Sequence, residues 1–322
     1  MDVEEIKEER NLLAFSAGVD SSALFFLLLE HNIKFDIALI NYGIRDQAKD
    51  EEAHALLLAN RYNLKVHIAH APTFKNNFEK NARDFRYAFF DELMENYDNL
   101  LTAHHLNDQL EWFLMRLTKG AGVNELMGLE RVSKRKDYRV IRPLLEYSKE
   151  ELLTYLEQHQ HPYFIDETNF NDKYERNIFR DRFANELIEN YKDGIVRSFN
   201  YLKQDKKSLM EGYRKIYQYK QLYILEVDNL TILPRIVDKY LKKLGYLLSA
   251  SQRNELNKES SIVFGGLWAV EIDKDRVYIA PYKRVSMSKK FKEECRVCKI
   301  PSKIRPYLYD NNIEPTALPM SS

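Results

Sequence analysis

The sequence predicts an α/β protein, with a parallel β-sheet in the first domain and a second, smaller, mainly helical α+β domain after it. Three observations predict this class. Short apolar runs alternate with amphipathic stretches through the first half. These runs are unbroken, as in strands buried on both faces. The alternation stops after about residue 190. Strand–helix alternation of this kind is typical of a Rossmann-like sheet with helices on both faces.

The predicted strands of the first domain lie in short apolar and β-branched runs. They are Leu12–Phe15, Phe35–Asn41, Leu64–His70, Leu100–Thr102 and Val140–Ile141. Helical periodicity fills the stretches Ser22–His31, Lys49–Tyr62, Asn77–Asn96 and Leu106–Lys119. Because ligands bind at the carboxyl ends of strands in such sheets, we expect the chemistry in the loops after Phe15, Asn41, His70 and Thr102.

The second half has a different pattern. Residues 197–227 are rich in Lys, Gln, Tyr and Leu and lack proline, which favours a long helix or a helical hairpin. A helical signal follows at Ile236–Leu248, and strand signals lie at Trp268–Ile272 and Val277–Ala280. The expected organisation is a first domain over 1–195, a helical linker over 196–230 and a C-terminal domain over 231–322.

The composition limits the class of protein to which the chain can belong. The chain is 44% hydrophobic and 30% charged, as in soluble globular proteins. Its net charge is zero, so a nucleic-acid surface requires local clustering of lysine and arginine. The first residues lack a signal-peptide pattern, and Ala23–Leu29 is too short to span a bilayer. Two cysteines cannot form a disulfide framework. We expect a cytoplasmic protein without a membrane segment.

The densest signal is the loop after the first strand, Ser16-Ala17-Gly18-Val19-Asp20-Ser21-Ser22. Small residues let the backbone approach a ligand, hydroxyl groups can donate to phosphate oxygens, and the following helix offers its first N–H groups to an anion. Asp20 is suited to hold Mg²⁺ against a phosphate. The alternative is an ordinary N-terminal cap formed by Asp20 or Ser21. Neither a Walker motif nor a complete G-x-G-x-x-G is present.

A second constellation, Ala103–Glu111, follows the fourth strand. On a helix, Asp108 and Glu111 are neighbours on the side opposite an apolar stripe. Two carboxylates at the ligand end of the sheet could hold an ammonium group or a metal. The alternative is a solvated acidic first turn. His104 and His105 are further candidates, although structural histidines are as common.

The first loop resembles the S-G-G-x-D-S signature of N-type ATP pyrophosphatases, with Ala17 for the first glycine. If that residue needs a positive φ, alanine costs on the order of 1 kcal/mol. Further motifs over roughly residues 11–180 resemble, in order, those of the tRNA(Ile)-lysidine synthases. They are Asn41–Arg45 (N-H-G-L-R), Ala82–Tyr87 (A-R-x-x-R-Y), Ala103–Glu111 (A-H-H-x-D-D-Q-x-E), Lys119–Gly122 (R-G-x-G), Arg142–Leu145 (R-P-L-L), Asp166–Asn169 (D-x-[ST]-N) and Arg176–Arg180 (R-N-x-[IF]-R).

The chain departs from this family pattern at four positions. Asn107, Trp112, Lys119 and Glu125 stand where the family has aspartate, threonine, arginine and glycine. Because Asn107 removes a negative charge beside the expected amine site, we assign the charge there to Asp108 and Glu111.

The resemblance implies a catalytic N-type ATP pyrophosphatase domain that modifies an isoleucine tRNA with a CAU anticodon. The C2 carbonyl oxygen of the wobble cytidine attacks the α-phosphate of ATP, and the ε-amine of free L-lysine then displaces AMP, which gives lysidine. The implied catalytic groups are Asp20 with Mg²⁺, Arg86, Asp108, Glu111 and Arg116. ATP would contact Ser16, Ala17, Gly18, Val19, Asp20, Ser21, Ser22, Asn41 and Arg45. The other substrates would contact His104, His105, Asp108, Glu111, Arg176 and Arg180.

Two basic regions are candidates for tRNA contact. Pro281–Tyr309 carries nine basic residues against two acidic ones, with Tyr282, Phe291 and Tyr307 interleaved. This pattern predicts a tRNA-binding C-terminal domain that tracks the backbone and stacks rings on bases. The alternative is a solvated basic tail. For Arg176 and Arg180, the alternative is pairing with neighbours such as Glu175 or Asp181.

Two other functions stay open. A sulfur-inserting enzyme would use the same activation with a thiol nucleophile, but Cys295-Arg-Val-Cys298 is at most half a zinc site. A non-catalytic tRNA-binding protein would fit the departures at Ala17 and Asn107. The sequence leaves the oligomeric state open, with a homodimer as one option.

Overall fold

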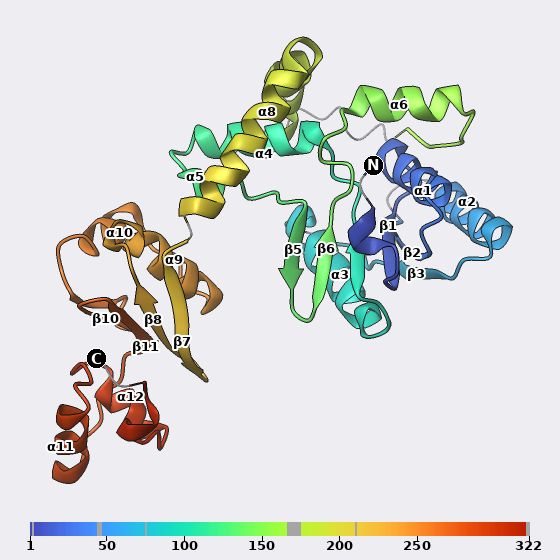
Figure 1. Cartoon of the computed structure of the whole chain (residues 1–322). Helices are drawn as coiled ribbons and strands as arrows, with labels where there is room; N and C mark the ends of the chain where they lie inside the picture. Colours follow the sequence, from blue (N-terminus) through green and yellow to red (C-terminus); the bar gives the residue numbers. More distant parts are fainter. Residues whose placement is uncertain (2, 44–46, 75, 166–174, 210, 320–322) are drawn as a thin grey trace. The chain divides into compact units, whose positions relative to one another are not determined.

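In a computed structural model of the chain, the described residues form two compact units, Met1–Lys203 and Gln204–Ser322 (Figure 1). The described residues are all except 2, 44–46, 75, 166–174, 210 and 320–322. The predicted α/β class is confirmed, and the division falls inside the stretch expected to be a linker. No helix in the described part of the chain is long and apolar enough to cross a membrane.

The first unit is built on a six-stranded sheet with the order β3-β2-β1-β4-β6-β5. Its strands are β1 (Asn11–Phe15), β2 (Phe35–Asn41), β3 (Val66–His70), β4 (Asn99–Leu101), β5 (Val132–Arg135) and β6 (Tyr138–Ile141). All neighbours pair in parallel except β5 and β6. After β3 the chain crosses back to place β4 on the other side of β1. The carboxyl ends of β1 and β4 therefore flank the topological switch point, where such sheets bind ligands.

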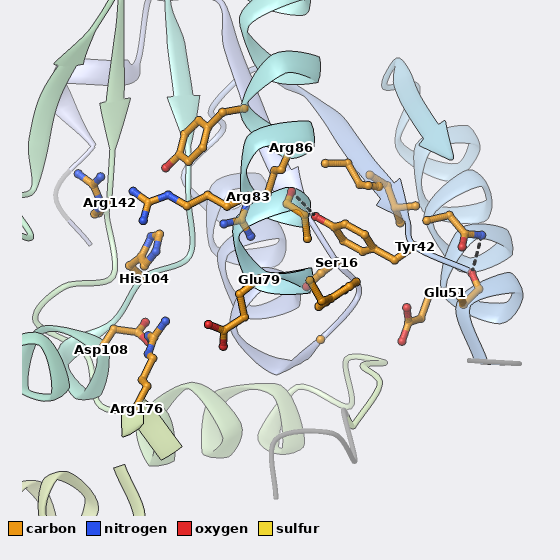
Figure 2. A pocket seen from close by; sticks show the side chains of 18 of the residues that line it. Ser16, Tyr42, Glu51, Glu79, Arg83, Arg86, His104, Asp108, Arg142 and Arg176 are labelled. Atoms are coloured by element: carbon orange, nitrogen blue, oxygen red, sulfur yellow. Dashed lines mark hydrogen bonds and ion pairs between the residues drawn. The ribbon is translucent and has the colours of Figure 1, made fainter. Parts of the chain in front are cut away.

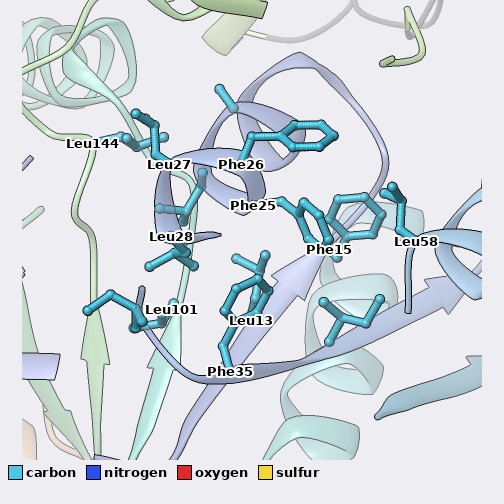
Figure 3. Packing of buried hydrophobic residues seen from close by; sticks show 14 of the residues in the cluster. Leu13, Phe15, Phe25, Phe26, Leu27, Leu28, Phe35, Leu58, Leu101 and Leu144 are labelled. Atoms are coloured by element: carbon cyan, nitrogen blue, oxygen red, sulfur yellow. The ribbon is translucent and has the colours of Figure 1, made fainter. Parts of the chain in front are cut away.

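Helices connect the strands of the first unit. They are α1 (Val19–Glu30), α2 (Gln47–Tyr62), α3 (Phe78–Leu93), α4 (Leu106–Leu117), α5 (Val123–Leu126), α6 (Lys149–Gln158), α7 (Glu175–Phe179), a π-helical turn (Arg180–Ala184) and α8 (Asn185–Leu209). Side chains alternate along β1, so Leu13 and Phe15 pack beneath α1, α2 and α6, whereas Leu12 packs beneath α3. Figure 3 shows the first of these clusters, in which Phe25 of α1 meets Phe15 and Phe35. Burial of both faces fixes the strand ends that carry the site.

The second unit contains a five-stranded antiparallel sheet with the order β7-β8-β11-β10-β9. Its elements are β7 (Tyr213–Tyr219), β8 (Leu222–Val227), α9 (Leu233–Lys243), α10 (Ala250–Glu255), β9 (Ser261–Phe264), β10 (Trp268–Asp273), β11 (Arg276–Pro281), α11 (Lys289–Val297) and α12 (Arg305–Asp310). Apolar side chains of α9 pack on one face of the sheet and those of α12 on the other.

The prediction of a helix or helical hairpin over 197–227 is wrong in its second half. Helix α8 ends at Leu209, and β7 and β8 follow as a hairpin. The Lys, Arg and Gln residues that suggested a helix are the solvent-facing members of β7, an edge strand. Tyrosine and isoleucine between them favour a strand, the pairing shifts register between Lys215 and Tyr217, and Lys220 adopts a positive φ of 48° at the turn.

Candidate functional site

The loop between β1 and α1 has the tight geometry that its small residues predict. Ala17 adopts φ 59° and is fully buried, which confirms that the first glycine position of the motif needs a positive φ. The Ser22 hydroxyl donates to the Ala17 carbonyl oxygen at 3.2 Å, and the Ser21 hydroxyl donates to the Gly18 carbonyl oxygen at 3.2 Å. These two hydroxyl groups are buried and hold the loop, whereas the Ser16 side chain is exposed.

The cost of the positive φ at Ala17 can be tested with a matched pair of substitutions. We expect Ala17→Gly to change the free energy of unfolding by less than about 1 kcal/mol, because relief of the positive φ offsets the lost methyl burial. Ala17→Val should destabilise by about 2 kcal/mol or more, since a β-branched residue is poorly tolerated at positive φ. Urea unfolding of the three proteins checks this. Equal stability of the glycine and valine variants would contradict it.

The loops after β1 and β4 meet through His105, the residue that caps α4. Its Nε2 lies 3.6 Å from Asp20 Oδ1 and 3.6 Å from Asp108 Oδ2. The Asp108 carboxylate also accepts a hydrogen bond of 3.0 Å from the His105 backbone N–H. Burial disfavours the imidazolium ion, but Asp108, Asp20 and Glu111 outweigh this effect and raise the pKa of His105. His105 thus links the loop after β1 and the carboxylates of α4 electrostatically.

His104 has the opposite electrostatic setting. Burial lowers the pKa of its imidazole to about 4, and the guanidinium groups of Arg142, Arg176 and Arg86 act in the same direction against the attraction of Asp108. Its Nδ1 lies 2.9 Å from the Thr102 hydroxyl oxygen. His104 is therefore neutral at pH 7.

This setting predicts a pH dependence. Because the folded state resists protonation of His104, the unfolded state binds more protons between an ordinary histidine pKa of about 6.5 and the lowered value. Stability from this group should be full above the unfolded pKa and decline by up to about 1.4 kcal/mol per pH unit below it. We expect His104→Gln to lose less stability than the wild type between pH 7 and pH 5 in urea unfolding. An identical loss would contradict the assignment.

Glu111 is the most buried carboxylate of the site, with 0% of its side chain exposed. Its Oε2 accepts a hydrogen bond from Arg176 Nε at 2.7 Å, and its Oε1 accepts one from Arg180 Nε at 2.7 Å. Arg176 also pairs with Asp108. The expected alternative for these arginines, pairing with Glu175 or Asp181, is wrong: Glu175 pairs with Lys119 at 2.6 Å. The arginines of α7 and of the π-helical turn instead neutralise the carboxylates of α4.

A cavity of about 730 Å³ opens at the switch point (Figure 2). Of the predicted residues, it is lined by Ser16, Gly18, Asn41, Arg86, His104, Asp108 and Arg176. Further lining residues that were not assigned to the site include Tyr42, Glu51, Glu79, Arg83, Tyr87 and Arg142. Figure 2 shows Arg83 and Arg86 of α3 extending toward His104 and Arg142. Arg83, Arg86 and Arg142 lie within the sequence motifs that carry the family resemblance, so these motifs could have identified them as site residues.

Comparisons with known proteins agree with this geometry. The family model of the PP-loop domain matches residues 2–187. A tRNA(Ile)-lysidine synthase of Campylobacter jejuni is 43% identical over 319 residues, which are 97% of this chain and 96% of that protein. A tRNA(Ile)-lysidine synthase of Helicobacter pylori is 41% identical over 95% of this chain and 91% of its own length.

The chain belongs to the tRNA(Ile)-lysidine synthase family. Among solved structures, the U34-tRNA thiolase NcsA of Methanococcus maripaludis matches with a TM-score of 0.50 and 20% identity, over 62% of this chain and 74% of that one. At this identity the likeness shows the fold alone.

Two of the departures from the lysidine synthase pattern, Asn107 and Trp112, form hydrogen bonds within the first unit. The Asn107 amide donates to Asn185 Oδ1 at 3.0 Å, and its oxygen accepts from the Lys149 backbone N–H at 3.1 Å. Asn107 therefore joins α4 to α6 and α8 and is not among the residues that line the cavity. The Trp112 indole N–H donates to the backbone carbonyl oxygen of Glu125 at 2.9 Å, an acceptor that any residue at this position supplies.

Several predicted residues lie apart from the cavity. Arg116 stacks on the Trp112 ring, with its guanidinium carbon 4.3 Å from the ring centroid, and is not among the lining residues. Arg45 and the motif Asp166–Asn169 lie outside the described residues. The predicted residues that border the site without lining the cavity are Ala17, Val19, Asp20, Ser21, Ser22, His105, Glu111 and Arg180.

Proposed function

We propose that this protein joins free L-lysine to C2 of the wobble cytidine in the CAU anticodon of an isoleucine tRNA, with ATP converted to AMP and pyrophosphate. The observation that carries the proposal is sequence identity of 43% and 41% with two tRNA(Ile)-lysidine synthases over nearly the full chain. A cavity at the switch point supports it. The substrates are all found in the cytoplasm, which is the proposed compartment. A homodimer stays a proposal as well.

The charge of the cavity supports ATP as the first substrate. Arg83 and Arg86 line it, and neither forms an ion pair with a carboxylate among the described residues. Uncompensated guanidinium groups are well suited to bind polyphosphate oxygens and to offset the charge that develops on them. The start of α1 adds N–H groups beside Ser16 and Gly18. We assign ATP to this side of the cavity.

The residues present fit a magnesium ion at Asp20. Its Oδ1 is buried and accepts no hydrogen bond from the described residues. No group of three or more His, Cys, Asp or Glu in the described part of the chain could hold a metal, so Asp20 would supply one ligand and phosphate oxygens the others, as Mg²⁺ sites commonly do. When bound, the ion would neutralise phosphate charge during adenylation.

The surroundings of the two carboxylates on α4 support different roles for them. Both carboxylates have partners: Asp108 pairs with Arg176 and accepts from the His105 backbone N–H, and Glu111 accepts from Arg176 and Arg180. Only Asp108 also lines the cavity. We therefore propose that Asp108 orients the lysine ammonium group, and that Glu111 positions the two arginines. The adenylated carbonyl oxygen leaves with AMP, because adenylation converts a poor leaving group into a good one.

The experiment that tests the proposal is transfer of radiolabelled lysine to an isoleucine tRNA with a CAU anticodon, with and without ATP. We expect ATP-dependent, acid-stable labelling that is absent with methionine tRNA. Pyrophosphate release without labelling would keep the ATP site and overturn lysine as the nucleophile. Absence of both signals would favour a non-catalytic tRNA-binding protein.

The sulfur-inserting alternative has less support. Cys295 is fully buried in the second unit, and burial raises the pKa of its thiol to about 11. Thiolate formation, which nucleophilic attack requires, is therefore disfavoured at pH 7. Cys298 is also a free thiol, and neither cysteine lines the cavity of the first unit.

A further inference from the structure

Helix α4 presents a row of three side chains to the cavity of the first unit. Asp108, Trp112 and Met115 all line this cavity. At about 100° per residue, positions separated by four and three residues fall on one side of a helix. The row begins with a carboxylate and continues, one and two turns further along, with an indole ring and a thioether. Beyond Asp108, the wall that α4 contributes is therefore apolar and aromatic.

The indole ring of Trp112 is held by contacts from three residues. Its N–H donates to the backbone carbonyl oxygen of Glu125 at 2.9 Å. The guanidinium carbon of Arg116 lies 4.3 Å from the ring centroid. The backbone of Gly128 comes so close that a Cβ atom at this residue would lie 2.7 Å from the indole nitrogen. A side chain that is already fixed in place loses little conformational entropy when a ligand binds to it.

The ring is a feature of this chain rather than of the family pattern, which has threonine at this position. Threonine is much smaller and has no aromatic face. In this chain the indole is half-buried, and it adds aromatic surface to a cavity wall that Met115 and Leu129 also form. The reaction common to the family does not require this surface, so its role lies in how this chain binds a substrate.

An aromatic ring in a binding cavity accepts either a cation or a second flat ring. Arg116 already places a positive charge against the Trp112 ring, so a further cation such as the lysine ammonium group would be repelled there. A nucleobase carries no charge and can stack on an indole, because every base has a π-face. The position of Arg116 therefore favours a nucleobase over an amine as the ligand of Trp112.

Two of the three rings that the sequence suggested for base stacking do not offer such a surface. In the stretch Pro281–Tyr309, Tyr307 is 3% exposed, and Phe291 packs against Tyr309 with ring centroids 5.0 Å apart. Tyr307 belongs to a hydrophobic core of the second unit, and Phe291 packs against that core. The expectation that these two rings stack on bases is therefore wrong. Contact between the lysines of this stretch and the RNA backbone stays a prediction.

We propose that the Trp112 ring is the surface on which the wobble cytidine stacks after it has left the anticodon stack. The inference rests on the proposed function for the identity of the base. A base that is modified at a ring atom must be turned out of its stack and held in the enzyme. Asp108, to which we assign the lysine ammonium group, lies on the same side of α4 and about 6 Å along its axis from Trp112. A base on the ring is thus next to the amine that attacks its C2.

The direct test is the fluorescence of Trp112, because stacking of a base on an indole quenches its emission. The chain has two tryptophans. The other, Trp268, is buried in the second unit, and subtraction of the Trp112→Phe spectrum removes its emission. An anticodon stem-loop with cytidine at the wobble position should quench the Trp112 emission strongly, and a stem-loop that is abasic at this position should not. Equal quenching by the two RNAs would overturn the proposal.

The same spectra distinguish the other ligands of the reaction. Quenching by ATP alone, to the extent expected of the cytidine stem-loop, would place adenine on the ring and overturn the proposal. Quenching by free lysine alone would identify Trp112 as part of the amine site and overturn it as well. We expect neither ligand to change the Trp112 emission as the cytidine stem-loop does.

Binding measurements on two variants separate stacking from a structural role of the ring. Trp112→Thr, which introduces the residue of the family pattern, should raise the Kd of the cytidine stem-loop about tenfold. Trp112→Phe keeps a ring and should raise it less than about threefold. The abasic stem-loop should bind equally to the wild type and both variants, because it has no base to stack. A Trp112→Thr variant that weakens both RNAs alike would contradict the proposal.

The matched control is Phe113→Leu, the neighbouring aromatic residue on α4. The Phe113 ring contacts Phe199 with centroids 5.5 Å apart, and Phe113 is not among the residues that line the cavity. This variant loosens the packing of α4 without changing the cavity wall, so it should bind both stem-loops like the wild type. Equal weakening of cytidine binding in Phe113→Leu and Trp112→Thr would attribute the effect to helix packing and overturn the proposal.

The proposed function and this inference can fail separately. If cytidine-dependent quenching is present but no lysidine forms, the proposed function is overturned and the stacking surface stands. If lysidine forms, but Trp112→Thr binds the cytidine stem-loop with the wild-type Kd, the proposed function stands and the stacking surface is overturned.

Discussion

Glu111→Gln is expected to destabilise the protein by about 3 kcal/mol and to lower kcat/KM for lysidine formation at least a hundredfold. Glu111 is fully buried and accepts hydrogen bonds from both Arg176 and Arg180. The glutamine has the same shape but no charge, so the two guanidinium groups lose their common counterion. Without it, Arg176 keeps only its pair with Asp108, and Arg180 loses its carboxylate partner. Urea unfolding and single-turnover labelling measure the two effects.

Two variants distinguish a positioning role of Glu111 from direct contact between Glu111 and the substrate. Asp108→Asn should raise KM for lysine while pyrophosphate release persists, because Asp108 lines the cavity. Glu111→Gln should impair both steps together. Glu150→Gln, an exposed change on α6, should leave stability within about 0.5 kcal/mol. If Glu111→Gln raised only the lysine requirement, Glu111 would contact lysine directly and the positioning role would be lost.

The sequence predicted the parallel sheet and the loop after β1 because both depend on local rules. Unbroken apolar runs indicate strands buried on both faces, and a run of small residues before a helix indicates a tight, anion-binding turn. The motif raised the question whether residue 17 needs a positive φ, and the structure shows that Ala17 has one. The ends of the predicted strands locate the loops at the switch point even when no side-chain contact is known. The position of the cavity could therefore also be predicted.

The partners within the site could not be predicted in this way. Helical spacing showed that Asp108 and Glu111 are neighbours, but their partner Arg176 lies 65 residues beyond Glu111. No local rule decides whether a carboxylate faces substrate or a distant arginine.

Asp20→Asn is expected to reduce pyrophosphate release about 10²- to 10³-fold, which is typical of losing one pre-organised charge contact in an active site. Asp20 Oδ1 is buried without a hydrogen-bond donor among the described residues. An asparagine amide is a weaker ligand for Mg²⁺ than a carboxylate. The variant should therefore need more Mg²⁺ for half-maximal release. Asp50→Asn, an exposed change on α2, is the matched control and should behave like the wild type.

The contact between Asp20 and His105 requires a second variant, because Asp20 also raises the pKa of that histidine. If Asp20 acted only through His105, then His105→Gln would reduce pyrophosphate release as strongly as Asp20→Asn, and the Mg²⁺ requirement would be the same in both variants. A carboxylate that holds the ion predicts a different outcome. Asp20→Asn alone should shift the Mg²⁺ titration, whereas His105→Gln should lower the rate at every Mg²⁺ concentration without moving the midpoint.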